Sequence, residues 1–182
     1  MRRRLYSPIE PDLISDFTIA LDVYARGYLT VYGRGAVVRE KTHEDAVREF
    51  EMRTRIAVRS IHALVRRVHM LNPFRYGFFA LQLWSHKVLR YLVPEVLAAV
   101  TVVGCVLALQ PGPRSWLYQA MVAVELGVIL LIPVVYLLSR LLGHPLNALY
   151  APVYFVNANL AAGWALIAYL RGSRSVTWRT IR

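Results

Sequence analysis

Ionisable side chains that could do chemistry lie mainly in the first half of this 182-residue sequence. Its aspartates stand only at positions 12, 16, 22 and 45, so no Asp-x-Asp pair offers a metal site. The single cysteine, Cys105, has no partner for a disulfide within the chain, and no Cys/His spacing fits a structural zinc site. Asp16 stands where a short helix is expected to begin, and the sequence alone favours the ordinary role of a helix N-cap for it.

A basic stripe is predicted on a long helix that the capping-box pattern Thr42-His-Glu-Asp45 opens. The opposite side of this helix is apolar. The stripe could be a solvated surface or face anionic lipid, or it could bind pyrophosphate or another polyanion. A helical wheel alone leaves these interpretations open. At 100° per residue, six basic side chains fall within about 80° of one another: Arg48, Arg55, Arg59, His62, Arg66 and His69.

The composition points to an anionic partner and to a membrane. Lys and Arg number 22 against 11 Asp and Glu, which gives a net charge of +11 and suggests nucleic acid, phospholipid headgroups or a phosphorylated substrate as the partner. Nucleic acid is not expected, because the chain contains no recognisable binding module. Apolar residues make up 57% and charged residues 18% of the chain, against about 45–50% and about 25% in soluble proteins. These values argue against a disordered chain and against an ordinary soluble domain.

Three long apolar runs follow Arg90, and each is long enough to cross a bilayer as a helix. They cover residues 91–109, 116–138 and 148–170, and about 20 apolar residues span the hydrocarbon core. Because 16 of the 22 basic residues lie at or before Arg90, the positive-inside rule places the polar N-terminal half in the cytoplasm. The sequence therefore predicts a multi-pass membrane protein with about three transmembrane helices.

Two acidic residues interrupt these runs. Glu95 lies near the start of the first run, where an interfacial, solvated position is expected. Glu125 lies near the middle of the second, where a carboxylate is costly unless it is protonated, paired or hydrated. It could line a passage for a glycan or a lipid-linked acceptor, or it could be hydrogen-bonded to Asn157 or Asn159 on the third run.

The polar half contains the pattern of a small piece of an α/β domain. Residues 15–27 predict a helix that ends at Gly27, and residues 28–32 and 36–38 predict a short strand pair. These elements are too small to enclose a core of their own. Residues 73–88 form an apolar but short segment, which suits a helix lying in the membrane interface.

Several segments taken together resemble the family 2 glycosyltransferases. The N-terminal segments are similar to the last part of the catalytic domain of that family, and the later ones to its membrane-associated members, the relatives of hyaluronan, poly-N-acetylglucosamine and cellulose synthases. The resemblance covers nearly the whole chain. It is carried by Ile14-Ser-Asp-Phe17, Asp22, Gly27–Tyr32, Phe50–Ile56, Leu71–Phe74, Leu83–Arg90, Pro94 and the tail from Tyr169 to Trp178.

The resemblance implies a role for individual residues. Asp16 matches the general base, which takes a proton from the acceptor hydroxyl as it attacks the anomeric carbon of the donor sugar. Arg55 matches an arginine that is implied to contact the donor pyrophosphate or to frame the acceptor. Arg48 and Arg59, on the same stripe as Arg55, are predicted to bind phosphate as well. Met52 and Ile56 replace the glutamine and tryptophan of the synthases' Gln-x-x-Arg-Trp motif, so the stacking platform that supports processive polymerisation is absent.

The resemblance also implies an organisation. The chain is expected to be mainly α-helical and membrane-embedded, with the end of a nucleotide-diphospho-sugar transferase domain at residues 1–41. An amphipathic basic helix (42–72), an interfacial helix (73–88), the transmembrane region (89–170) and a basic tail (171–182) are expected to follow. A donor-binding half with an Asp-x-Asp site for Mg or Mn is expected to precede Met1 or to come from a partner chain, and no cofactor is expected within this chain.

The activity implied is inverting transfer from a nucleotide-sugar donor to a glycan or lipid acceptor, in polysaccharide or glycolipid synthesis at the bacterial inner (plasma) membrane. Membrane lipids and a donor-domain chain are the expected partners. The isolated chain is expected to be inactive, because the donor site and its metal are absent from it. The alternative is a non-catalytic membrane scaffold or accessory subunit of a polysaccharide assembly complex.

Overall fold

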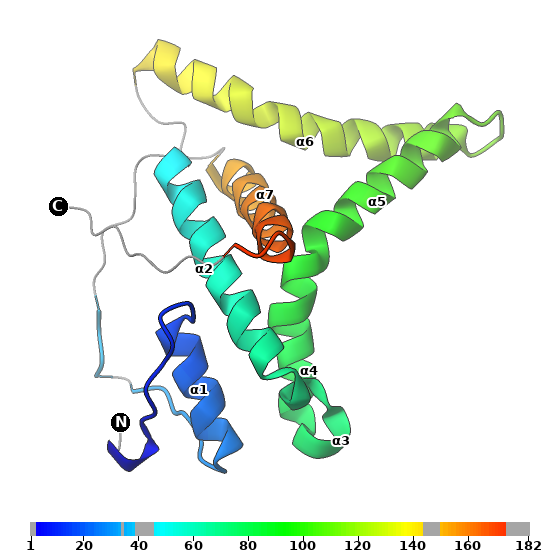
Figure 1. Ribbon diagram of the computed structural model, residues 1–182. Helices are drawn as coiled ribbons and strands as arrows, with labels where there is room; N and C mark the ends of the chain where they lie inside the picture. The colour runs from blue at the N-terminus through cyan, green and yellow to red at the C-terminus, as the bar shows by residue number, and fades with distance from the viewer. Residues whose placement is uncertain (1–2, 34, 39–45, 144–149, 174–182) are drawn as a thin grey trace. The chain divides into compact units, whose positions relative to one another are not determined.

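The computed structural model describes residues 3–33, 35–38, 46–143 and 150–173, and it is mainly helical (Figure 1). The chain divides into two compact units. One contains residues 1–90 and 164–182, and the other contains residues 91–163.

Helix α1 (Ser15–Ala25) confirms the short helix predicted near the N-terminus. Its N-cap is Ile14, whose side chain makes no capping hydrogen bond, so the prediction of Asp16 as the cap is wrong. Asp16 instead lies within the first turn. The helix ends as predicted, because Gly27 has a φ of +79°, a conformation that residues with a Cβ rarely adopt.

The predicted strand pair is not formed: residues 28–33 and 35–38 carry no strand, nor does any other described part of the chain. Leu29, Val31, Tyr32 and Val38 are 76–88% exposed. A strand needs the edge of another strand for its backbone hydrogen bonds, and the described residues provide none. The α/β remnant is therefore not seen, although the residue types favour a strand locally.

Helix α2 (Ala46–Arg66) is the predicted amphipathic helix, although the capping box at Thr42–Asp45 lies outside the described residues. Its apolar side is buried through Ala57, Val58, Ile61 and Leu64. The expectation that the same helix carries the stripe as far as His69 is wrong. The α-helix ends at Arg66, and His69 lies on a 3-10 turn, η2 (Val68–Leu71), which places Met70 in a buried cluster with Leu21 and Leu83.

The predicted interfacial helix at residues 73–88 is replaced by several shorter elements. Helix α3 (Pro73–Tyr76) is followed by Gly77, whose φ of +54° breaks the helix. Helix α4 (Phe78–Leu83) and a π-helical turn, η3 (Trp84–Val88), then continue into α5 (Leu89–Leu109). The first apolar helical stretch thus runs over Phe78–Leu109, 32 residues, and includes residues that the sequence assigned to the interface.

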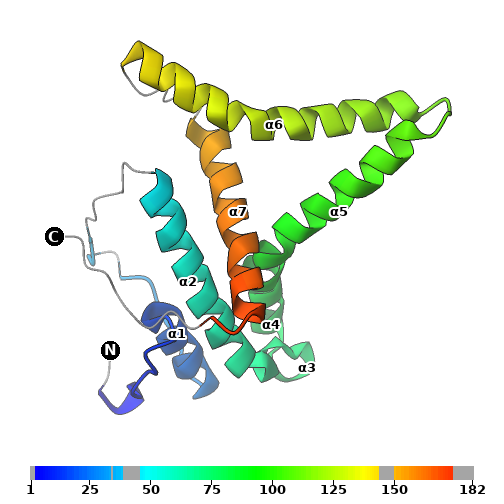
Figure 2. The ribbon, with the colours of Figure 1, turned by 45° about the horizontal axis from the view of Figure 1, so that its top comes forward.

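The three predicted apolar runs are helices: α5, α6 (Ser115–Leu142) and α7 (Tyr150–Leu170). Each is long and apolar enough to cross a membrane. Most of their large apolar side chains are exposed, such as Val124, Leu141 and Leu109, which is the pattern expected for helices solvated by lipid. Helices α5 and α6 diverge from the turn at residues 110–114 that joins them (Figures 1 and 2).

Near that turn, α5 and α6 approach closely at Gly104. A Cβ added there would lie 2.9 Å from Met121 Cε and 3.0 Å from Val122 Cγ2. Small residues at such places let membrane helices pack closely.

We predict that Gly104→Leu destabilises the protein and Gly127→Leu does not. The added side chain at Gly104 would overpack the α5–α6 contact and cost about 1–3 kcal/mol. A side chain at Gly127 of α6 would meet no atom within 4 Å, which makes it the matched control. The measurement is the thermal unfolding midpoint of both variants in the same detergent. Equal midpoints for the two variants would contradict this packing.

Candidate functional site

Asp16 is the second residue of α1, and its side chain is exposed to solvent. Its Oδ1 accepts a hydrogen bond of 2.8 Å from the backbone N–H of Phe17. The unpaired N–H groups of a helix N-terminus favour a negative charge at this place. The carboxylate is thus both held in place by the backbone and open to a reactant from outside.

Lys87 is a neighbour of Asp16 that sequence reasoning did not single out. Its Nζ lies 4.3 Å from the centre of the Phe17 ring, and its ammonium interacts electrostatically with the Asp16 carboxylate. Lys87 belongs to η3, in the first of the three long apolar stretches. The two residues are 71 positions apart in the sequence, and no local pattern connects them.

The loop that leads to α1 is held by two arginines of the basic stripe. Arg59 is only 7% exposed, and its Nη2 donates hydrogen bonds to the carbonyl oxygens of Pro11 and Leu13, at 2.7 and 2.8 Å. Arg66 makes ion pairs with Glu10 at 2.9 Å and with Asp12 at 2.8 Å. The loop is therefore tied to α2 immediately before the helix that carries Asp16.

A third arginine fixes α1 itself. Arg67 donates two hydrogen bonds to the carboxylate of Asp22, at 2.6 Å from Nε and 2.9 Å from Nη2. This two-point geometry holds orientation as well as distance. We call Arg59, Arg66 and Arg67 the arginine clamp. It joins α2 and the residue that follows it to the loop before α1 and to Asp22 within α1. Helix α1 lies beside α2 (Figure 1).

The residues of the predicted basic stripe differ in exposure and in their contacts. Arg48 is exposed and Arg55 is half-buried, and each makes contacts of its own. His62 packs edge-on against the Tyr169 ring, with the ring centres 4.7 Å apart, and its Nε2 lies 3.1 Å from the Ser173 carbonyl oxygen. Phosphate binding by Arg48, Arg55 and Arg59 stays a prediction. Arg59 already has hydrogen-bond acceptors within the chain.

An aromatic pocket at the other end of α1 was not foreseen from the sequence. The Tyr24 ring stacks on Phe79 with centres 3.7 Å apart, and Tyr76 lies 6.4 Å from Tyr24. Tyr24 and Tyr76 line a cavity of about 330 Å³ together with Tyr28 and Arg75. Aromatic faces with a charged side chain at the edge suit a ligand that has both apolar and polar surface. The only sequence signal was the cluster of tyrosines around Gly27.

The two acidic residues of the second unit are both partly buried. Glu125 and Asn159 line the same cavity, but Asn159 Nδ2 donates to the Phe155 carbonyl at 2.8 Å. Within the described residues, Glu125 Oε2 is buried without a hydrogen-bond partner, so the bond to an asparagine is not formed by that oxygen. Glu95 Oε2 is buried without a partner in the same part of the chain, which differs from the solvated position expected.

Among the residues that the structure describes, no group of three His, Cys, Asp or Glu side chains could hold a metal ion. The divalent metal was expected in a donor-binding half, and that expectation stays untested. Comparison with protein-family models, curated protein sequences and solved structures finds no match to this chain.

We predict that Arg59→Ala destabilises the first unit much more than Arg75→Ala. Loss of two hydrogen bonds from a buried guanidinium should cost about 3 kcal/mol, or about 6–12 °C in unfolding midpoint for a chain of this size. Arg75 is exposed and lies 5.6 Å from the Tyr76 ring centre, so its loss should change the midpoint by less than about 3 °C. Thermal unfolding in detergent measures both. A similar small shift for each variant would show that the clamp does not hold α1.

Proposed function

We propose that this chain is the acceptor-side, membrane-embedded part of an inverting glycosyltransferase that uses a nucleotide-diphosphate sugar. The observation that carries the proposal is the Asp16 carboxylate, which is exposed at a helix N-terminus and held by a backbone N–H. The arginine clamp fixes the loop before that helix, and Asp22 within it. A general base must be accessible and fixed in position before it can be effective. The resemblance of the surrounding segments to family 2 enzymes adds the type of reaction.

In the proposed step, the acceptor hydroxyl gives its proton to Asp16 while its oxygen bonds to the anomeric carbon of the donor sugar. The bond from that carbon to the nucleotide diphosphate breaks, and the diphosphate leaves with the electron pair. Attack from the side opposite the leaving group inverts the configuration. The divalent metal that neutralises the diphosphate would be bound by a donor-binding domain outside these residues.

Arg55 is the best placed residue of the stripe for the departing diphosphate. It lies four positions before Arg59 on α2 and therefore projects from the same side of the helix. Arg59 reaches the loop before Asp16, so a ligand at the start of α1 would be within reach of the same side of α2. Arg48, two turns earlier, would extend the positive surface along the helix.

The surroundings of Asp16 favour an acceptor that is attached to the membrane or grows at its surface. Lys87, the neighbour of Asp16, belongs to an apolar stretch long enough to span a bilayer. Phe74 and Phe78 are 99% and 73% exposed in the segment before it, as expected for side chains that insert at a membrane interface. A reacting hydroxyl would then meet Asp16 near the headgroups.

The first test is purification of the tagged full-length protein from its own membranes, followed by mass spectrometry and by transfer assays with radiolabelled nucleotide sugars. We expect an Asp-x-Asp-bearing domain, either in the same polypeptide or as a co-purifying chain, and metal-dependent transfer by the complex. If polysaccharide assembly proteins co-purify without any donor-binding domain or transfer activity, the scaffold alternative replaces the enzyme.

We predict that Asp16→Asn in this complex lowers the transfer rate about 10²–10⁴-fold, the usual contribution of a general base. Nucleotide-sugar affinity and unfolding midpoint should be unchanged, because Asp16 is exposed and does not belong to the clamp. Glu10→Gln is the control: it removes an exposed carboxylate from the loop before α1. Its partner Arg66 keeps the ion pair with Asp12, so this variant should leave most of the activity. An Asp16→Asn complex that retains full activity would eliminate the proposed base.

A further inference from the structure

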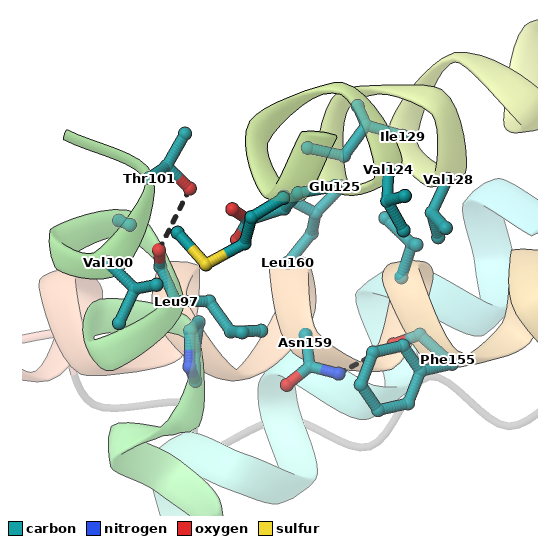
Figure 3. A pocket seen from close by; sticks show the side chains of 14 residues that line it. Leu97, Val100, Thr101, Val124, Glu125, Val128, Ile129, Phe155, Asn159 and Leu160 are labelled. Carbon is teal, nitrogen blue, oxygen red and sulfur yellow. Dashed lines mark hydrogen bonds between the residues drawn. The ribbon is translucent and has the colours of Figure 1, made fainter. Parts of the chain in front are cut away.

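Helices α5, α6 and α7 border a cavity of about 500 Å³ within the second unit (Figure 3). Its walls come from residues 94–101 of α5, 121–129 of α6 and 155–160 of α7, which lie toward the middle of each helix. Apolar side chains such as Leu97, Val128 and Phe155 form most of the surface. The volume falls in the range of ligand pockets, about 300–1,000 Å³.

Three polar side chains interrupt this apolar lining: Thr101, Glu125 and Asn159. The Thr101 hydroxyl donates to the Leu97 carbonyl at 2.9 Å, and Asn159 Nδ2 donates to the Phe155 carbonyl at 2.8 Å (Figure 3). Both side chains therefore donate to a carbonyl acceptor on their own helix. Glu125 differs, because its Oε2 is buried and accepts no hydrogen bond from the described residues.

A buried carboxyl oxygen without a partner is costly in apolar surroundings. A ligand that enters the cavity with a hydrogen-bond donor would remove that cost, whereas a plain hydrocarbon chain would not. The rest of the lining requires that such a ligand be apolar over nearly all of its surface. The chemistry that fits both conditions is a lipid-like chain or ring system that carries a hydroxyl group.

The size of the cavity argues against a helix of a partner protein as the occupant. A helix about 10 Å across occupies about 800 Å³ in each 10 Å of its length, more than the whole cavity of about 500 Å³. A single lipid chain is thinner and can enter between helices that diverge, as α5 and α6 do (Figure 1).

We propose that this cavity is a binding site for a membrane-soluble alcohol, with the hydroxyl donating to Glu125 and the apolar chain lying against Leu97, Val128 and Phe155. The site is independent of the proposed sugar transfer, since every residue that forms it belongs to residues 91–163. It assigns Glu125 a binding role that requires neither a donor-binding domain nor a metal.

The test uses the full-length protein in vesicles of phosphatidylethanolamine and phosphatidylglycerol. The probe is hexadecanol carrying a diazirine and an alkyne, and its methyl ether, which lacks the donor, is the matched probe. After irradiation, peptide mass spectrometry locates the labelled residues. We expect the alcohol to label cavity residues about fivefold more than the ether, the preference that one net hydrogen bond supplies.

Four variants separate the hydrogen bond from the cavity itself. Glu125→Leu should abolish the preference for the alcohol, whereas Glu125→Gln, which keeps a carbonyl acceptor, should retain most of it. Val128→Trp should fill the cavity and lower labelling by both probes at least about fivefold. Leu126→Trp, two positions along α6 and outside the lining, should label as the wild type does, and it controls for misfolding caused by a new tryptophan.

Three results would overturn the proposal. Equal labelling by the alcohol and the ether in the wild-type protein would reduce the site to ordinary contact with bilayer lipid. Cavity labelling that persists in Val128→Trp would place the probe elsewhere. Absence of cavity labelling, together with cross-linked oligomers that Val128→Trp dissociates, would assign the cavity to a helix of another chain.

Discussion

The hydrogen bonds of Arg59 are the interaction on which the first unit most depends. A guanidinium group buried beneath the loop at residues 10–14 would be strongly destabilising without acceptors, and the carbonyls of Pro11 and Leu13 supply them. In turn, those two carbonyls fix the path of the chain just before α1. Arg66 and Arg67 extend the same contact to Glu10, Asp12 and Asp22. The path of the chain that leads to Asp16 is thus set by side chains that lie about 50 residues later in the sequence.

The features predicted correctly from the sequence are those that local composition determines. Helices α5, α6 and α7 follow from long apolar runs, and α1 follows from its periodicity and from Gly27. The strand pair at residues 28–38 is wrong because strand formation depends on a neighbouring edge, which no local pattern reports. The roles of Arg59, Arg66 and Lys87 were missed for a similar reason. A helical wheel places charges on one side of a helix. It does not reveal that Asp12 and Asp16, in a distant segment, lie next to Arg66 and Lys87.

The second unit presents a different constraint. Its helices expose large apolar side chains, so a membrane stabilises them, but Glu95 and Glu125 each carry a buried oxygen without a hydrogen-bond partner among the described residues. The energetic cost of such groups in hydrocarbon makes a functional role the first hypothesis for them. Helix α7 lies close to Glu95, since a Cβ added at Gly163 would lie 3.7 Å from Glu95 Oε1. Glu125 instead lines a cavity, where a ligand has space to supply the missing donor.

The ion pairs of the clamp also show which basic residues do not contribute to the net charge of +11. Arg66 and Arg67 are neutralised by acidic residues within the chain, so the excess positive charge belongs to other residues. Arg75 and Arg90 are two of these, and they lie in the short segment that also exposes Phe74 and Phe78. Cations next to exposed aromatic rings favour contact with anionic headgroups, at about 1 kcal/mol for each basic residue near the surface. The segment at residues 73–90 is therefore broken into several elements, unlike the single helix expected, yet it keeps the side chains of a membrane interface.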